Sequence, residues 1–138
     1  MFTFGRQHEK ACATRHLRDP QQAELIEGVI DTVQDLLEGV ATDDTIRPKF
    51  IRGLVEGGSG VWEQTGSWLS KIIVDQPNLE GVWSELASHV EWKVRFRVAC
   101  FINVMSPTLA LEIGAQLMRD RSKKVRDMAE ARLQEIGP

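Results

Sequence analysis

The chain has 138 residues, of which 42% are hydrophobic and 27% charged, and its formal net charge at pH 7 is −3. This length is typical of one domain, which buries about two-thirds of the surface that the unfolded chain exposes. The small negative charge gives no general attraction toward nucleic-acid backbones or acidic membranes. We find no apolar run of signal-peptide or membrane-spanning length, and we therefore expect a cytoplasmic protein.

Residues 1–19 form a basic, weakly patterned segment, for which we expect at most a short helix. His8, Cys12 and His16 recur at every fourth position and would share one face of such a helix. These side chains are ligands for borderline metals, but no fourth ligand is evident nearby. Solvated histidines are the simpler interpretation, and we predict no metal and no cofactor. Cys12 and Cys100 belong to no CxxC motif and are interpreted as reduced, buried side chains.

The strongest helical pattern begins at Pro20, where Asp19 provides an N-cap and the proline fits the first turn. Apolar residues recur at helical spacing from Ala23 to Val40. Residues 21–45 contain seven acids and no Lys or Arg, and five of the acids stack on the side opposite the apolar residues. A solvated face is the simpler interpretation of this side, and a docking surface for a basic partner is the functional one. The five acids are Glu24, Glu27, Asp31, Asp35 and Glu38.

Turn and capping signals divide the rest of the chain into short helices. Gly57, Gly58 and Gly60 interrupt the pattern, and they form a connector because no Lys-Ser or Lys-Thr follows to complete a phosphate-binding loop. Apolar residues do not alternate with period two, which disfavours a β-sheet. We therefore predict an all-α fold of short antiparallel helix pairs. The predicted helices cover residues 45–55, 61–74, 79–88, 92–105, 107–119 and 123–136.

Residues 83–137 contain one helical unit twice, at a fixed separation in the sequence. The dipeptide Val94-Arg95 corresponds to Val125-Arg126. We call the separation of these two dipeptides in the sequence the repeat interval. Apolar residues follow both dipeptides at helical spacing. Self-similarity at a fixed interval is the sequence signature of a repeat array. The apolar pairs at the repeat interval are Leu86 with Leu117, Val98 with Ala129, Ile102 with Leu133 and Met105 with Ile136.

In the second copy, Asp120 is followed six positions later by Arg126, the Arg of the pair Val125-Arg126. Ala129 and Leu133 then follow at helical spacing. In this order the segment resembles a HEAT-type repeat. His89 holds the place of the Asp in the first copy, which interrupts the Asp–Arg ladder implied between repeats and leaves the pairing of Arg95 open. The resemblance covers residues 83–137 and implies a HEAT-like α-solenoid that binds macromolecules on its concave side. With the length of the chain, we expect one helical-repeat domain over residues 1–138. The resemblance also implies mainly intramolecular roles for Arg95 and Arg126.

We predict a protein–protein interaction module without enzymatic activity, since no GxSxG, HExxH or paired-carboxylate signature is present. The five acids would meet a basic protein, as in a small bacterial adaptor or an immunity-type inhibitor. Trp62 and Trp83 are the expected aromatic contacts with the partner.

The alternative is a nucleic-acid-binding HEAT-like protein. Residues 91–138 carry nine cations against six acids, whereas residues 21–45 carry a net charge of −7. The basic residues would contact phosphates, although they equally fit a solvated face that pairs with nearby acids. The residues of this alternative basic patch are Lys93, Arg97, Arg119, Arg121, Lys123 and Lys124.

Overall fold

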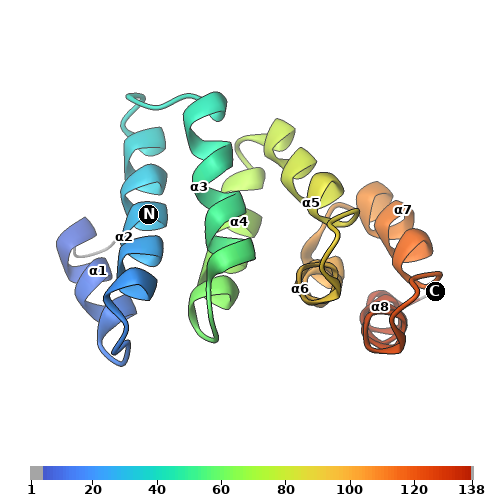
Figure 1. Ribbon diagram of the computed structural model, residues 1–138. Helices are drawn as coiled ribbons and strands as arrows, with labels where there is room; N and C mark the ends of the chain where they lie inside the picture. Colours follow the sequence, from blue (N-terminus) through green and yellow to red (C-terminus); the bar gives the residue numbers. More distant parts are fainter. Residues whose placement is uncertain (1–4, 138) are drawn as a thin grey trace. The chain divides into compact units, whose positions relative to one another are not determined.

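The computed structural model describes residues 5–137, except for the side chain of Asp43. Over this range it contains eight α-helices, two short 3-10 helices and no β-strand, which confirms the predicted all-α class (Figure 1). The chain divides into two compact units, Met1–Asp75 and Gln76–Pro138, named here the N-terminal unit and the C-terminal unit. Residues 1–4 of the predicted N-terminal segment lie outside the described residues. The single repeat domain over residues 1–138 stays a prediction.

The N-terminal unit consists of α1 (Arg6–Thr14), α2 (Pro20–Leu37), α3 (Asp43–Glu56) and α4 (Val61–Ile73). Asp19 caps α2 as predicted, because its side chain accepts a 2.9 Å hydrogen bond from the N–H of Gln21. The helix ends at Leu37 and does not reach the predicted Val40. Gly39 adopts φ 75°, a left-handed conformation that favours glycine and terminates helices. Leu37 and Val40 are consequently exposed.

The core of the N-terminal unit lies between α2, α3 and α4, which pack against one another. Thr42 and Thr45 form a capping box that starts α3 two residues before the predicted position. Helices α3 and α4 approach closely at Gly53, where an added Cβ would lie 2.6 Å from Thr65 Oγ1. The buried apolar side chains of this unit are Ile26, Val29, Ile30, Val33, Ile46, Phe50, Leu54, Val61, Trp68, Leu69 and Ile72.

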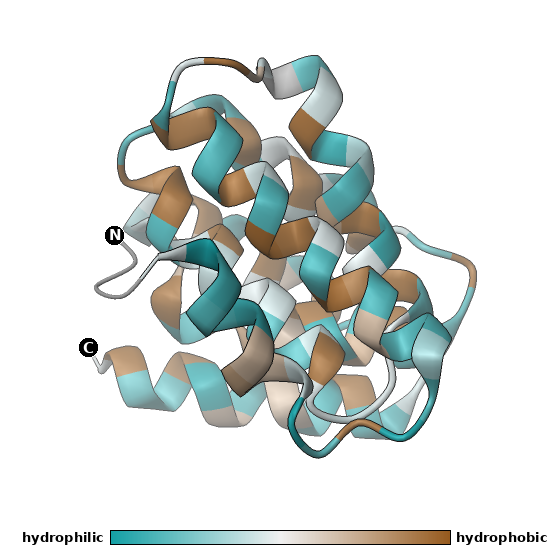
Figure 2. Ribbon diagram, turned by 90° about the vertical axis from the view of Figure 1, so that its left-hand side faces the viewer, coloured by the Kyte–Doolittle hydropathy of each residue, from teal (hydrophilic) through white to brown (hydrophobic). Residues whose placement is uncertain are grey.

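The first helix, α1, packs only on the outside of this unit. It lies along α2, and none of its residues from Arg6 to Thr14 is buried. Figure 2 shows α1 nearest the viewer, with hydrophilic residues over its first half. Polar groups therefore make a large part of its contact with α2. No helix within residues 5–137 combines the length and the apolar character needed to cross a bilayer.

The C-terminal unit consists of η1 (Pro77–Glu80), α5 (Gly81–Leu86), α6 (Trp92–Cys100), η2 (Ile102–Val104), α7 (Pro107–Leu117) and α8 (Lys123–Ile136). Its helices pair as α5–α6 and α7–α8, and α8 packs on both α6 and α7. The predicted helix over 92–105 ends early, because Phe101 leaves the helix and stacks on Trp83 with ring centroids 5.0 Å apart. The bounds of α8 agree with the prediction.

Candidate protein-binding surface

The acidic side of α2 is partly covered by cations from α1. Arg6 Nη1 lies 3.1 Å from Asp31 Oδ1, and its Nη2 lies 3.0 Å from Asp35 Oδ1 and 3.3 Å from Glu38 Oε2. Lys10 Nζ lies 2.7 Å from the other oxygen of Asp31. Three of the five predicted acids are therefore paired within the chain. That Arg6 and Lys10 are their partners was not predicted from the sequence.

The charge of Arg6 is stabilised by this cluster. Its hydrogen bond to Asp35 raises the pKa of Arg6 above the ordinary value, against the opposing effect of desolvation. The guanidinium is placed to bridge carboxylates on successive turns of α2, because Asp31, Asp35 and Glu38 are spaced by four and three positions. This arrangement relieves the repulsion that like charges at this spacing otherwise cause. The acidic face therefore accepts a basic helix laid along it.

The first half of α2 is arranged differently, because α1 does not pair its acids. Glu24 is exposed and Glu27 is half-buried, and neither forms an ion pair within residues 5–137. Both line a cleft of about 560 Å³ between α2 and α3. Lys49, Arg52 and Glu56 line its α3 side. The hydrogen bond to Glu56 raises the pKa of Arg52 above its ordinary value.

Gln22 fixes the end of this cleft, a role that the sequence analysis missed. Its Nε2 donates to the backbone oxygen of Glu56 at 3.2 Å, and its Oε1 accepts from the N–H of Gly58. One side chain thus ties the first turn of α2 to the connector after α3. A glutamine in a first helical turn carries no distinct sequence signal, so only the tertiary structure identifies the contact.

The two predicted aromatic contacts have different environments. Trp62 is half-buried near the start of α4. Trp83 is only 1% exposed and stacks on Phe101 inside the C-terminal unit. The prediction that Trp83 contacts a partner is therefore wrong, because its ring already forms part of the core.

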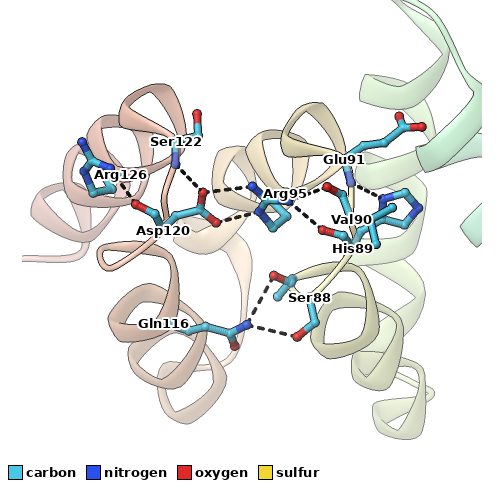
Figure 3. Close-up of polar contacts among 10 residues, drawn as sticks. Ser88, His89, Val90, Glu91, Arg95, Gln116, Asp120, Ser122 and Arg126 are labelled. Atoms are coloured by element: carbon cyan, nitrogen blue, oxygen red, sulfur yellow. Dashed lines mark hydrogen bonds and ion pairs between the residues drawn. The ribbon is translucent and has the colours of Figure 1, made fainter.

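The C-terminal unit holds a buried ion pair between its two helix pairs (Figure 3). Arg95 Nε donates to Asp120 Oδ2 at 2.7 Å, and its Nη2 donates to Asp120 Oδ1 at 3.2 Å. Both side chains are only 7% exposed. The pairing of Arg95 left open by the sequence is thus made with the Asp of the following copy.

Local contacts around this pair recur at the repeat interval (Figure 3). Arg95 Nη1 donates to the backbone oxygen of His89, and Arg126 Nη1 donates to that of Asp120, each at 2.7 Å. The side chains of His89 and Asp120 both accept from the N–H two residues later, at 3.1 and 2.8 Å. His89 therefore replaces the Asp in closing the turn before the helix, although it cannot offer a carboxylate to another arginine.

The electrostatics of Asp120 follow from these contacts. Burial alone would raise the pKa of its carboxyl group. Hydrogen bonds from Arg95 and from the N–H of Ser122 outweigh burial, and the pKa of Asp120 lies below its ordinary value. The pair is structural in position, since it joins α6 to the turn before α8.

The members of the alternative basic patch lie in the first and last turns of α6, in the turn before α8 and in the first turn of α8. All of its members are exposed except Arg97, which is half-buried. Lys123 pairs with Asp127 at 2.7 Å. Lys124 Nζ lies 5.3 Å from the ring centroid of Trp92, which is 38% exposed. An exposed indole beside several cations was not predicted.

The histidines and cysteines offer no metal centre in the described part of the chain. His8 Nε2 lies 3.5 Å from Cys12 Sγ, but α1 ends at Thr14, so His16 does not share their helical face. Within residues 5–137 no three His, Cys, Asp or Glu side chains are grouped to hold an ion. Cys12 is exposed and Cys100 half-buried, which corrects the expectation that both are buried.

Comparison of the sequence with models of protein families and with curated proteins finds no match, and neither does comparison of the fold with solved structures.

Proposed function

We propose that this chain is a HEAT-like helical-repeat protein without catalytic activity, whose role is to bind another protein. The matching hydrogen bonds of Arg95 and Arg126 support the repeat, because two arginines at the repeat interval donate to the backbone in the same way. Repeat arrays of this kind provide extended surfaces for macromolecules. Free cysteines accord with a cytoplasmic location.

The observation that carries the proposal is the pairing of α1 with α2. A basic helix already lies along half of the acidic face, with Arg6 reaching three carboxylates. Glu24 and Glu27 continue the same face without an ion pair in the described chain. A basic segment of another protein would meet them as α1 meets Asp31.

The partner that fits this surface is a basic protein with Arg or Lys side chains on a helix or loop. The cleft beside Glu24 and Glu27 has room for such side chains, since its volume is about 560 Å³. Carboxylates at the rim would also accelerate association with a cationic partner. A small adaptor or an immunity-type inhibitor that masks a basic protein would work in this manner.

The test is affinity capture from native lysate with three forms of the tagged chain: wild type, Glu24→Lys/Glu27→Lys, and the control Glu112→Lys. Glu112 is an exposed acid on α7, so its reversal changes the net charge in the same direction, by half as much as the double variant, away from the cleft. Each form is captured with and without nuclease treatment and washed at two salt concentrations. We expect a stoichiometric basic protein with wild type and with the control, and at least tenfold less with the double variant.

Equal recovery with all three forms would remove the cleft from the proposal. Recovery that depends on intact nucleic acid would instead favour the second candidate function. Circular dichroism of the double variant checks that its helices are retained.

The second candidate is binding of single-stranded nucleic acid at the basic patch of the C-terminal unit. The specific observation in its favour is the exposed Trp92 ring beside Lys124, since bases stack on aromatic rings and cations hold the phosphates. Titration of a labelled oligonucleotide should give salt-dependent binding that Trp92→Ala reduces. The matched control is Lys71→Gln, which removes the cation beside Trp68 in the N-terminal unit. Binding that ignores Trp92→Ala would exclude this candidate.

A further inference from the structure

The outer face of the α7–α8 pair contains an open hollow of about 450 Å³. Met118 is 44% exposed at its edge, and Leu133 is half-buried within it. Ile136, in the last turn of α8, is another exposed apolar side chain. The remaining residues that line the hollow are Glu130, Gln134 and Gly137.

The corresponding face of the preceding pair is covered. Ala87 and Ile102 precede Met118 and Leu133 by the repeat interval, and they are 1% and 0% exposed. They are buried in the C-terminal unit, where α7 and α8 both pack on α6 and η2. The α5–α6 face is thus occupied by a helix pair, whereas the equivalent α7–α8 face is open in the described chain.

The covering pair is held by a specific set of polar contacts. The carboxylate of Asp120, in the turn between α7 and α8, receives two hydrogen bonds from Arg95. Gln116 donates to the backbone oxygen of Ala87 at 3.3 Å, and Arg132 donates to that of Cys100 at 3.0 Å. The structural element that covers the α5–α6 face is therefore a helical hairpin with an Asp in its turn.

Arg126 repeats Arg95 at the open face. Its Nη1 is fixed on the backbone oxygen of Asp120 in the way that Arg95 is fixed on His89. Its Nε and Nη2, the groups with which Arg95 holds a carboxylate, donate to no residue within 5–137. Arg126 is half-buried and its guanidinium is already anchored on Asp120, so a carboxylate can bind it at little cost in side-chain entropy.

We infer that the outer face of α7–α8 binds a helical hairpin of a partner protein, with an Asp or Glu in the hairpin turn held by Arg126. Apolar side chains of that hairpin cover Met118, Leu133 and Ile136. The partner is defined by charge complementarity at Arg126 and by the hairpin that covers the equivalent face. This surface differs from the cleft between α2 and α3, and the two proposals fail independently.

The test uses the full chain and a labelled synthetic peptide of residues 107–137, whose sequence is that of the covering hairpin. Fluorescence anisotropy measures its binding to wild type and to the variants Arg126→Gln, Met118→Gln and Arg121→Gln. We expect saturable binding that Arg126→Gln weakens by roughly tenfold, as loss of a charge-assisted pair implies. Asp120→Asn in the peptide should weaken its binding to the wild-type chain by the same factor. Met118→Gln in the full chain should weaken peptide binding to a lesser degree. Arg121→Gln, which removes an equal charge from an exposed position, should change binding less than twofold.

Three results would overturn the inference. One is the absence of saturable peptide binding to the wild type. Another is binding that ignores Arg126→Gln, which would mean that the peptide replaces α7–α8 on Arg95. The third is a concentration-dependent dimer in sedimentation that Met118→Gln abolishes, which would assign the face to a second copy of the chain. Circular dichroism of Arg126→Gln establishes that its loss of binding is not a loss of fold.

Discussion

Arg6 and Arg95 each pair with carboxylates, yet their surroundings differ. Arg6 reaches three acids of α2 from a helix in which no residue from Arg6 to Thr14 is buried. Arg95 reaches one acid, but both partners are only 7% exposed, and Arg95 also donates to the backbone oxygens of His89 and Val90. Arg6 therefore has more charged partners than Arg95, but water competes for the contacts of Arg6 and is largely excluded from those of Arg95.

The comparison separates structural pairs from exchangeable ones. Water and salt screen an exposed ion pair, so its loss costs little and another cation can replace the first. A buried pair costs desolvation to form, but removal of one partner leaves an uncompensated charge. We therefore expect Arg95 and Asp120 to hold the C-terminal unit together. The Arg6 cluster is the one whose partners can be exchanged.

The largest expected effect is that of Arg95→Leu. The substitution leaves the Asp120 carboxylate buried without its cation, and we expect a loss of about 3–5 kcal/mol in the free energy of unfolding. Urea denaturation measures it as a lower midpoint with an unchanged slope. Arg126→Gln removes a single hydrogen bond at a half-buried position and serves as the matched control, with a much smaller loss.

A double-mutant cycle with Asp120→Asn sharpens this prediction. The asparagine oxygen still accepts from the N–H of Ser122, so the cycle isolates the contact with Arg95. The double variant should be more stable than the sum of the single losses implies. Additive losses would mean that the two side chains do not interact in solution.

The next effect concerns helix packing, which is similarly tight in both units. Gly53→Ala would bring a Cβ to 2.6 Å from Thr65 Oγ1, and Gly114→Ala would bring one to 2.7 Å from Leu133 Cδ2. Overpacking of this kind costs about 1–3 kcal/mol. Thr65 is β-branched and buried, whereas Leu133 borders an open hollow and can rotate. We therefore expect the larger drop in urea midpoint for Gly53→Ala, and the reverse order would contradict this account of the two contacts.

Local signals explain which helix ends could be predicted from the sequence. Ser122 and Gly137 bracket α8, and the predicted bounds are those of the structure. The side chain of Ser122 makes no capping hydrogen bond, and Asp120 instead accepts from the N–H of Ser122 in the turn before the helix. The end of α6 depends on the stacking of Phe101 on Trp83, which lies on another helix. No local sequence pattern reveals this contact. The repeat interval did place Arg95 and Asp120 in successive copies. It did not show that the Arg of one copy binds the Asp of the next.

The acidic surface was predictable in composition but not in pairing. The spacing of the carboxylates put all five acids on one side of α2, yet the cation that binds three of them lies at least 25 residues away in sequence. The only sequence signal was the charge balance, since the basic segment around Arg6 and Lys10 precedes seven acids. Charge balance indicates attraction between segments without giving their geometry. The error at Trp83 is of another kind, because the sequence does not show that its ring stacks on Phe101 inside the C-terminal unit.

A smaller effect is expected from pH. The folded-state pKa of Asp120 lies below its ordinary value, so the unfolded chain takes up the proton first as the pH falls. The stability that this group contributes is complete above the ordinary Asp pKa and is lost as the pH falls through the folded value. The stability difference between wild type and Asp120→Asn should therefore narrow below about pH 4. A difference that stays constant as the pH falls through the folded-state pKa would exclude the ion pair as its source.

The smallest effect on stability, and the most informative for function, is that of Arg6→Gln. Because the Arg6 side chain is 28% exposed and its three acids are 38%, 40% and 52% exposed, water screens the cluster, and the urea midpoint should shift less than for any variant above. The same change releases Asp35 and Glu38 from their cation, so a labelled oligoarginine peptide should bind more tightly at low salt. Arg15→Gln, at an exposed position just after α1, removes an equal charge without touching the cluster and should leave peptide binding nearly unchanged. Tighter binding for Arg6→Gln alone means that α1 competes with a basic partner for α2. Weaker binding of the oligoarginine peptide to Arg6→Gln would mean that Arg6 helps to form the binding surface. The contacts of Arg6 with the acids of α2 would then be structural and not exchangeable.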